Sequence, residues 1–489
     1  MLFRKEKDIP EKKRKKDKGS SPKKNREIFV TTYFFVALFL GMMAYLCYFT
    51  ATSRQDMYNN SYNSRQELLL TQNYRGTIYA RDGEVLASTK TDAAGNETRE
   101  YPYAEMFSHV VGFSTHGRTG IEAQANYYLI NSNTPLSNKV MNDMSGAKNP
   151  GDSVYTTLDV ELQETAYKAL GVYNGAIIVT EPSTGRILAM VSKPDFDPNH
   201  VAEEWEKLTQ DAKKGELINR ATQGLYPPGS TFKIATALEY MRENPDTYSA
   251  YHYNCNGRFT LDGNTIQCYH GANHGSIGFV ESFAKSCNSS FANIGTELDH
   301  TAFRKTLNDL LFDQELPVKF QYSRSSVHMT KDISTEEMMQ TSIGQGKTLV
   351  TPLHLNMITC AIANNGTLMK PYAIETVKSS TGSTVKRFSD SAYGRLLSET
   401  EAAALKDMMV EVLESGTARV LKGQPYIAAG KTGSAEYNSK GDSHAWFTGF
   451  APAEDPQVCV TIIIEGAGSG GDYAVPVARR IFDAYFEQQ

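Results

Sequence analysis

A stretch of 26 residues without a charged side chain, residues 28–53, limits the fold of this chain more than any other feature of its sequence. Its first part is long and apolar enough to cross the hydrocarbon core of a bilayer as a helix. We therefore predict a transmembrane helix over residues 28–50. A cleaved signal peptide is the alternative, because Ala51, Thr52 and Ser53 are small, but its apolar core would be unusually long.

Charge is unevenly distributed around this stretch. Residues 1–27 contain twelve Lys or Arg and five Asp or Glu, a net charge of +7, so the remaining residues carry −12 and the whole chain −5. By the positive-inside rule, we expect residues 1–27 to be a basic cytoplasmic tail and everything after about Thr52 to lie outside the cytoplasm. The acidic body has no basic stripe, which argues against nucleic-acid binding.

The segment after the membrane helix, residues 51–152, is predicted to be a small, strand-rich, non-catalytic pedestal domain. Residues 75–86 contain two alternating apolar pieces around Asp82-Gly83, which indicates a hairpin. Residues 120–129 favour a helix. No nucleophile with a neighbouring base stands out in this region.

Glu122 and residues 136–152 are two further features of the pedestal. Glu122 could act as an acid, but a lone glutamate on a helix is usually solvated. Residues 136–152 are rich in Ser, Asn, Gly and Pro, a composition that is typical of a linker. We therefore expect an exposed Glu122 and an irregular connection to the next domain.

The larger part of the chain, residues 153–489, has the pattern of an α+β domain. Helical segments lie between strand hairpins, which implies an antiparallel sheet flanked by helices. The predicted strands are 153–159, 175–180, 187–192, 427–435 and 458–464, and the predicted helices include 160–170, 352–363 and 475–486.

Six cysteines in 489 residues are not a disulfide framework. Cys255, Cys268, His270 and His274 have the spacing Cys-x12-Cys-x-His-x3-His, which allows a zinc site, and Cys255 and Cys268 alone could close a disulfide loop. The two-residue spacing of many zinc-binding cysteine pairs is absent, and the surrounding residues are those of a Gly-rich hairpin. Free thiols are therefore favoured, with a disulfide or a zinc site as alternatives.

Residues 226–233, Tyr-Pro-Pro-Gly-Ser-Thr-Phe-Lys, combine a turn with the start of a helix. The apolar pattern of residues 232–241 suits a largely buried helix. Ser230 would open that helix near its positive dipole end, where an anion is favoured, and Lys233 could reach the Ser230 hydroxyl. The tetrad alone is a weak signal, since a capping serine beside a solvated lysine gives the same pattern.

Two further motifs strengthen the signal. Ser286-Cys287-Asn288 begins 56 residues after Ser230, and Lys431-Thr432-Gly433 begins 145 residues after Ser286. Ser-x-x-Lys, Ser-x-Asn and Lys-Thr-Gly in this order are the signature of serine acyltransferases that act on penicillin-like amides. Cys287 is expected to point away from its neighbours as a small buried residue.

With these motifs the chain resembles the penicillin-binding proteins, in particular the class B group of monofunctional transpeptidases. The resemblance covers about residues 28–489 and implies the transpeptidase fold on a membrane-proximal pedestal. Further similar blocks are Arg75-Gly76-Thr77-Ile78, Gly120-Ile121-Glu122, residues 175–190 and 195–199, His274-Gly275, Gly344-Gln345-Gly346, residues 363–366 and residues 446–452.

The resemblance implies a catalytic role for five residues. Ser230 is the nucleophile and Lys233 its base, and burial together with the positive charge of Lys431 would lower the pKa of Lys233. Ser286 would relay a proton to the departing amine, and the Asn288 amide would hold the peptide group of the substrate.

The last motif is expected to bind substrate. The resemblance implies an oxyanion hole made by the backbone N–H groups of Ser230 and Ser434. Thr432 and Ser434 share one face of a strand, so their hydroxyls would bind a terminal carboxylate, and Gly433 would leave room for the substrate backbone. Ser434 stands where threonine is more usual, so we expect altered β-lactam affinity more than lost activity. No metal or organic cofactor is required.

The resemblance also implies substrates and partners. A peptidoglycan stem peptide ending in D-Ala-D-Ala would acylate Ser230, and the amine of a neighbouring stem would take the acyl group; β-lactams would block Ser230 covalently. The membrane helix and pedestal would bind a multi-pass lipid II polymerase. A D,D-carboxypeptidase or β-lactamase, with water as the acceptor, is the closest alternative, and a non-catalytic β-lactam sensor or scaffold is a second. Septation, elongation and spore-cortex synthesis remain open as the cellular role.

Overall fold

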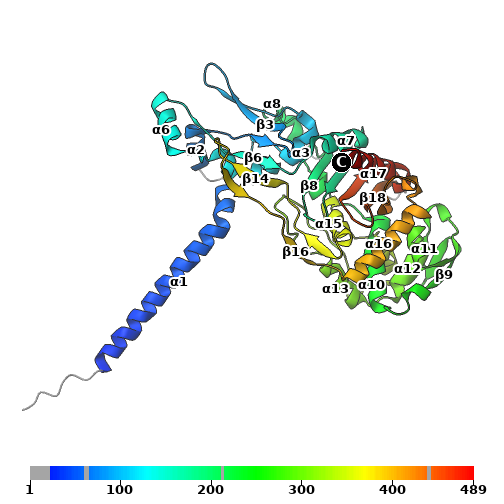
Figure 1. Cartoon of the computed structure of the whole chain (residues 1–489). Helices are drawn as coiled ribbons and strands as arrows, with labels where there is room; N and C mark the ends of the chain where they lie inside the picture. The colour runs from blue at the N-terminus through cyan, green and yellow to red at the C-terminus, as the bar shows by residue number, and fades with distance from the viewer. Residues whose placement is uncertain (1–22, 60–64, 211–213, 438–441, 489) are drawn as a thin grey trace, which may run out of the picture. The chain divides into compact units, whose positions relative to one another are not determined.

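The computed structural model describes residues 23–59, 65–210, 214–437 and 442–488. The chain divides into two units, residues 1–60 and residues 61–489 (Figure 1). Most of the predicted basic tail, residues 1–22, lies outside the described residues.

The first unit contains the helix α1 (Lys23–Asn59), whose residues Asn25–Thr50 are long and apolar enough to cross a membrane. All side chains of this span are exposed. The hydroxyls of Thr31, Thr32 and Thr50 each donate to a backbone carbonyl one turn earlier, so they bring no unsatisfied donor into an apolar environment. The predicted membrane helix is therefore present, and it fits a single-pass anchor.

The second unit begins with a six-stranded sheet in the order β15-β14-β6-β2-β3-β4. Strand β2 (Ile78–Tyr79) pairs antiparallel with β3 (Val85–Thr91), which confirms the predicted hairpin. This sheet combines strands from both sides of residue 152, where the sequence predicts the end of the pedestal. The other members are β4 (Glu97–Glu100), β6 (Ser153–Thr156), β14 (Ile374–Lys378) and β15 (Thr384–Arg387).

Glu122 is fully buried, so the expectation that it is solvated is wrong. It belongs to α4 (Gly120–Gln124), which together with α5 (Asn126–Ile130) forms the predicted helix with a break at Ala125. Its carboxylate lies 2.5 Å from Arg75 and 2.8 Å from Arg99. Burial would raise the pKa of the Glu122 carboxyl, but the two guanidinium groups outweigh burial and hold it below its ordinary value.

Residues 136–152 are not an irregular linker. They contain the helix α6 (Leu136–Ser145), which ends at Gly146 with a left-handed φ of 70°, and the short strand β5 (Asn149–Pro150). The α6 side chains of Leu136, Met141 and Met144 are exposed. The polar composition concealed this helix because it contributes no residue to the core.

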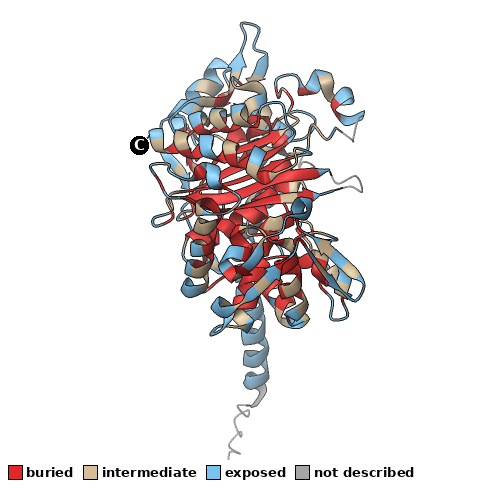
Figure 2. Ribbon diagram, turned by 90° about the vertical axis from the view of Figure 1, so that its right-hand side faces the viewer, coloured by how far each residue is buried: buried red, intermediate tan, exposed pale blue. Residues whose placement is uncertain are grey.

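The large domain is built on five antiparallel strands in the order β17-β18-β19-β7-β8, which confirms the predicted fold class. All residues of β7, β18 and β19 are buried, and Figure 2 shows these strands in red. The strand β18 was not among those predicted. The bounds are β7 (Gly175–Thr180), β8 (Ile187–Lys193), β17 (Ala429–Glu436), β18 (Ser443–Ala451) and β19 (Val458–Ile464).

Helices cover both faces of this sheet, which explains the complete burial of its three central strands, β18, β19 and β7. Thr448 of β18 shares a hydrogen bond with Thr359 on one face, while the adjacent Phe447 packs against Phe482 on the other. The first face is covered by α15 (Pro352–Ala363), and the second by α17 (Gly470–Glu487) with α7 (Val160–Leu170) beside it.

A helical region beside β17 completes the domain, with α10 (Lys233–Glu243) packed among its helices. The predicted Cys255–Cys268 hairpin is present as β10 (Arg258–Leu261) and β11 (Asn264–Gln267). The other elements of this region are β9 (His252–Cys255), β12 (Gly275–Gly278), α11 (Phe279–Ala284), α12 (Asn288–Glu297), α13 (His300–Asp309), α14 (Thr335–Ser342) and α16 (Glu399–Glu414). Short elements elsewhere are α2 (Arg65–Gln72), β1 (Asn73–Tyr74), α3 (Ser108–Val111), α8 (Val201–Gln210), α9 (Arg220–Gln223), β13 (Thr367–Met369) and β16 (Ala392–Arg395).

Candidate active site

The turn that carries Ser230 depends on Gly229. Gly229 has a left-handed φ of 53°, and a Cβ at this position would lie 2.8 Å from the backbone oxygen of Ser434, so glycine is required on both counts. Residues Gly229–Phe232 form a 3-10 turn, and α10 begins at Lys233. Ser230 thus precedes the α-helix by one short turn, with its side chain partly exposed.

Lys233 is fully buried at the start of α10. Its Nζ donates to the backbone oxygen of Ser286 at 2.8 Å, to Ser286 Oγ at 3.3 Å and to Asn288 Oδ1 at 2.7 Å. No hydrogen bond joins Lys233 to Ser230 among the described residues. The sequence indicates that the Lys233 amine can reach Ser230, but in this structure Ser286 and Asn288 of the Ser-x-Asn motif hold that amine.

Ser286 connects the three motifs. Lys431 Nζ donates to Ser286 Oγ at 2.9 Å, and the same oxygen accepts from Lys233. Ser286 has a φ of 55°, a left-handed conformation that is uncommon for a non-glycine residue and that is often found at functional sites. This conformation turns the chain between α11 and α12.

Burial lowers the pKa of both lysines. The pKa of the Lys233 ammonium falls from 10.5 to about 8, because burial disfavours its charge, although the thiols of Cys287 and Cys268 oppose the shift. The pKa of Lys431 lies well below its ordinary value, first through burial and then through repulsion by Lys233. The repulsion that we expected to act on Lys233 is thus found at Lys431. A Lys233 with this pKa is partly neutral near pH 7 and can accept a proton.

Strand β17 carries the third motif along the cleft. Thr432 Oγ1 shares a hydrogen bond of 2.5 Å with Thr417 Oγ1, and the Gly470 N–H donates to Ser434 Oγ at 3.3 Å. These contacts fix the orientation of both hydroxyls. Sequence reasoning missed Thr417, because a single threonine in a turn gives no signal.

Gly433 lets β17 approach the Ser230 turn closely. A Cβ at Gly433 would lie 3.0 Å from Thr231 Cγ2 and 3.1 Å from the backbone oxygen of Pro228. In the neighbouring strand β18, Trp446 pairs with Gly433, and its Nε1 donates to the backbone oxygen of Pro227 at 3.1 Å. The turn is therefore held against the central sheet.

The predicted residues gather at one cleft of about 1360 Å³. Lys233 and Lys431 are buried beneath it and connect to it through Ser286. The predicted residues that line the cleft are Ser230, Ser286, Asn288, Thr432, Gly433 and Ser434. Cys268 and His274, for which the sequence analysis gives no catalytic or substrate-binding role, also lie in its wall.

Two family models match the chain. The model described as the penicillin-binding protein transpeptidase domain matches residues 175–483. The model described as the penicillin-binding protein A dimerisation domain matches residues 75–154.

Individual relatives agree with these models. The peptidoglycan D,D-transpeptidase PbpA of Mycolicibacterium smegmatis is 32% identical over 434 residues, which are 83% of this chain and 87% of that protein. PbpA of Mycobacterium tuberculosis is 31% identical over 497 residues, with 94% and 98% covered.

Solved structures of penicillin-binding protein A from M. tuberculosis have the same fold. Its imipenem acyl-enzyme complex has a TM-score of 0.78 at 29% identity, with 85% of this chain and 99% of that chain covered. Its penicillin G acyl-enzyme complex has a TM-score of 0.76 at 29% identity, with 85% and 100% covered. The chain therefore belongs to the penicillin-binding protein transpeptidase family, in its class B group.

Proposed function

We propose that the protein is a peptidoglycan D,D-transpeptidase that cross-links stem peptides through an acyl-enzyme on Ser230. The observation that carries this proposal is the convergence of three distant segments at one cleft: Ser230, Ser286 and β17, joined by hydrogen bonds from Lys233 and Lys431. Acyl transfer needs a nucleophile, a base of suitable pKa and a proton relay within reach of one another.

In the first step Ser230 Oγ attacks the carbonyl carbon of the penultimate D-alanine, and neutral Lys233 takes the hydroxyl proton. Lys233 Nζ is held by Ser286 and Asn288 in this structure, so it must move within hydrogen-bond reach of Ser230 when substrate binds. Catalytic hydrogen bonds commonly tighten only in the substrate complex. The N–H groups of Ser230 and Ser434 would stabilise the oxyanion.

Collapse of the tetrahedral intermediate breaks the peptide bond and releases D-alanine. The departing amine needs a proton, which can pass from Lys233 through Ser286 Oγ. Lys431 donates to the same oxygen and so keeps it oriented. In the second half-reaction the amine of a neighbouring stem peptide attacks the ester on Ser230 and forms the cross-link.

The third motif fits the terminal carboxylate of the donor peptide. The Thr432 and Ser434 hydroxyls border the cleft, and Gly433 adds no side chain between them. A β-lactam carries a carboxylate and an amide in a similar arrangement, and opening of its ring would leave a stable ester on Ser230. The acyl-enzyme complexes of one relative, penicillin-binding protein A from M. tuberculosis, with imipenem and penicillin G support this part of the proposal.

We further propose that the protein is a single-pass membrane protein whose N-terminus is cytoplasmic and whose catalytic domain is extracytoplasmic. The span Asn25–Thr50 is preceded by the basic tail, with its net charge of +7 over residues 1–27. In this orientation the cleft lies on the side of the membrane on which peptidoglycan is found.

A multi-pass lipid II polymerase is the proposed partner of the membrane helix and the pedestal. Deleting the pedestal would disrupt the sheet that it shares with β14 and β15, so point substitutions are the better test. We expect Met141→Glu with Met144→Glu, on the exposed side of α6, to reduce polymerase co-purification from detergent. Val172→Glu, at an exposed apolar residue of the large domain, is the matched control, and equal recovery from both would contradict this partner surface.

The central experiment uses the purified protein and its Ser230→Ala variant. Fluorescent penicillin tests acylation, and a D-Ala-D-Ala stem analogue with excess D-amino acid tests transfer, with products followed by mass spectrometry. Labelling that is lost in Ser230→Ala, with transfer to the amine faster than hydrolysis, is the expected result. Hydrolysis alone would identify a carboxypeptidase, rapid penicillin turnover a β-lactamase, and no labelling of folded protein a scaffold.

A further inference from the structure

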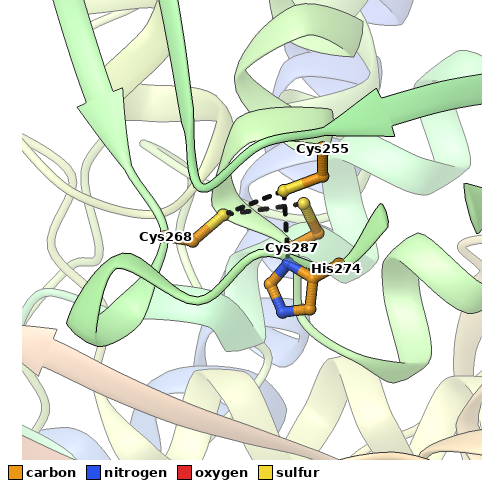
Figure 3. Close-up of side chains that lie close together, drawn as sticks. All are labelled: Cys255, Cys268, His274 and Cys287. Carbon is orange, nitrogen blue, oxygen red and sulfur yellow. Dashed lines mark hydrogen bonds between the residues drawn. The ribbon is translucent and has the colours of Figure 1, made fainter. Parts of the chain in front are cut away.

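Three thiols and one imidazole form a compact cluster beside the cleft. Cys255 ends β9, Cys268 follows β11, His274 precedes β12, and Cys287 caps the N-terminus of α12. The three cysteines are buried and His274 is half-buried. Figure 3 shows the four side chains pointing toward one another from four separate segments.

The distances match the edges of a tetrahedron around a metal ion. The Sγ atoms of Cys255 and Cys268 are 3.7 Å apart, those of Cys268 and Cys287 are 3.7 Å apart, and Cys255 Sγ lies 3.4 Å from His274 Nδ1. All four ligand atoms lie within 4.8 Å of one another. A zinc–sulfur bond of about 2.3 Å gives a tetrahedral sulfur–sulfur edge of about 3.8 Å.

The same distances do not describe a disulfide. A disulfide needs an S–S distance of about 2.05 Å, and the cysteines of the cluster are free in the structure. The ligand set also differs from the one that the sequence suggested. His270 is exposed and takes no part in the cluster, whereas Cys287 does. The spacing of residues in the sequence could not show that Cys287 takes the place of His270, because the position of Cys287 depends on how α12 packs against the β10–β11 hairpin.

Backbone N–H groups point at each of the three sulfur atoms. Cys255 Sγ accepts from Gly257 at 3.4 Å, Cys268 Sγ from Ser289 at 3.5 Å, and Cys287 Sγ from Ser290 at 3.4 Å. Such donors stabilise sulfur that carries negative charge and orient it toward a metal. Three converging thiolates with one imidazole are a soft donor set that suits zinc.

We propose that Cys255, Cys268, His274 and Cys287 bind one zinc ion in a closed tetrahedral site. Binding forms three zinc–sulfur bonds and one zinc–nitrogen bond, and the three thiol protons leave to solvent without any redox change. With four protein ligands no position stays open for water, so the site is structural and not catalytic.

The zinc ion would position the second catalytic motif. Cys287 lies between Ser286 and Asn288, and the Asn288 amide donates to the backbone oxygen of Gln267, next to Cys268, at 3.0 Å. Fixing the ligands therefore fixes the segment that holds Lys233. This consequence rests on the proposed function, whereas the metal site itself does not.

The test measures zinc in the full-length protein, purified in detergent under reducing conditions and then equilibrated with zinc. We expect about one zinc per chain in the wild type and about a tenth of that or less in Cys268→Ser and Cys287→Ser. His270→Ala, on the same loop but outside the cluster, and Cys47→Ser, a thiol of the membrane helix, should keep the wild-type content. Equal zinc in all variants, or none in the wild type, would overturn the proposal.

Two measurements on the unmutated chain avoid reliance on variants that fold poorly. Cobalt(II) in place of zinc should give the thiolate charge-transfer and intense d–d absorption of a tetrahedral sulfur site, and their absence would overturn the proposal. A metal-free protein whose mass is two hydrogens lower than that of the reduced chain would show a disulfide instead.

The positioning role has its own readout. Removal of zinc by a chelator should slow penicillin labelling at least about tenfold, and added zinc should restore the rate. If zinc binding is confirmed and the labelling rate does not change after chelation, the positioning role is rejected. Ser230→Ala should lose labelling and keep its zinc, so failure of the metal site and failure of the proposed activity are distinguishable.

Discussion

Lys431 Nζ lies 2.9 Å from Ser286 Oγ, although 145 residues separate the two in the chain. The same oxygen lies 3.3 Å from Lys233 Nζ, so a single hydroxyl connects two buried lysines. Burial lowers the pKa of both lysines, and because two positive charges this close are unfavourable in a low-dielectric interior, repulsion by Lys233 lowers the pKa of Lys431 further. Ser286 therefore lies where a proton can move between the lysines and the cleft.

The pKa of Lys233 predicts the pH dependence of acylation. The base is the neutral amine, whose fraction increases as the pH rises through about 8. We expect the second-order rate constant for penicillin acylation to rise about tenfold between pH 6 and pH 7 and to level off above about pH 9. Rates of penicillin labelling, determined at constant ionic strength over this pH range, would measure the pH dependence of the rate constant.

A rate that is constant over this range would remove Lys233 from the role of base. Lys233→Arg is the matched variant, because arginine keeps the positive charge and does not lose its proton in this pH range. It should be inactive at every pH.

Removal of the Ser286 hydroxyl should interrupt the proton path. We expect Ser286→Ala to slow acylation about 100-fold, within the range for loss of an acid–base group, with little change in melting temperature. Alanine meets the same backbone strain as serine at a φ of 55°, so the substitution isolates the hydroxyl. Ser276→Ala, at an exposed serine of β12, should acylate normally; unchanged acylation in Ser286→Ala would exclude the relay.

Glu122 should be important for stability and not for chemistry. Glu122→Gln leaves the buried charges of Arg75 and Arg99 without a carboxylate, so we expect the free energy of unfolding to fall by about 3–5 kcal/mol. Urea denaturation would measure this loss, while labelling per folded molecule should not change.

The control is an exposed ion pair between β3 and β4 of the six-stranded sheet. The side chains of Lys90 and Glu100 are 69% and 40% exposed, so Glu100→Gln should cost less than about 1 kcal/mol. An equal decrease in the free energy of unfolding in Glu122→Gln and Glu100→Gln would mean that the buried cluster stabilises the fold no more than an exposed ion pair does.

Local signals in the sequence predicted much of this fold. The helix α15 has the predicted bounds, Pro352–Ala363, and the structure shows local reasons for them: Thr351 caps it, proline occupies its first turn and apolar residues fill it. The apolar run of β19 and the hairpin of β7 with β8 were equally clear. The three motifs marked the residues that gather at the cleft, since their residue types and order are specific.

The errors concern contacts between residues far apart in the chain. The partners of Glu122 lie 47 and 23 residues away, so no local pattern showed that this glutamate is paired and buried. The sequence indicates that the Lys233 amine can reach Ser230, three residues away, but it gives no sign that Asn288, 55 residues away, binds this amine in the structure. Cys287 joins a cluster for the same reason: tertiary packing, not spacing, brings it to Cys268.

Gly433 offers the sharpest test of how closely β17 must approach the nucleophile. A Cβ in Gly433→Ala would lie 3.1 Å from the backbone oxygen of Pro228, two residues before Ser230, and 3.0 Å from Thr231. Backbone yields less readily than a side-chain tip, so β17 and the turn would separate by a few tenths of an ångström. We expect acylation to slow about 10- to 100-fold, because the Ser230 and Ser434 N–H groups no longer converge on one oxygen.

Gly394→Ala is the matched control for this substitution. A Cβ at Gly394, in β16, would meet nothing within 4 Å, so its acylation rate and melting temperature should equal those of the wild type. Gly433→Ala should stay folded, with a melting temperature within a few degrees of the wild-type value, because the strand can shift toward the cleft. An unchanged acylation rate in folded Gly433→Ala would show that the oxyanion is not held between the Ser230 turn and β17.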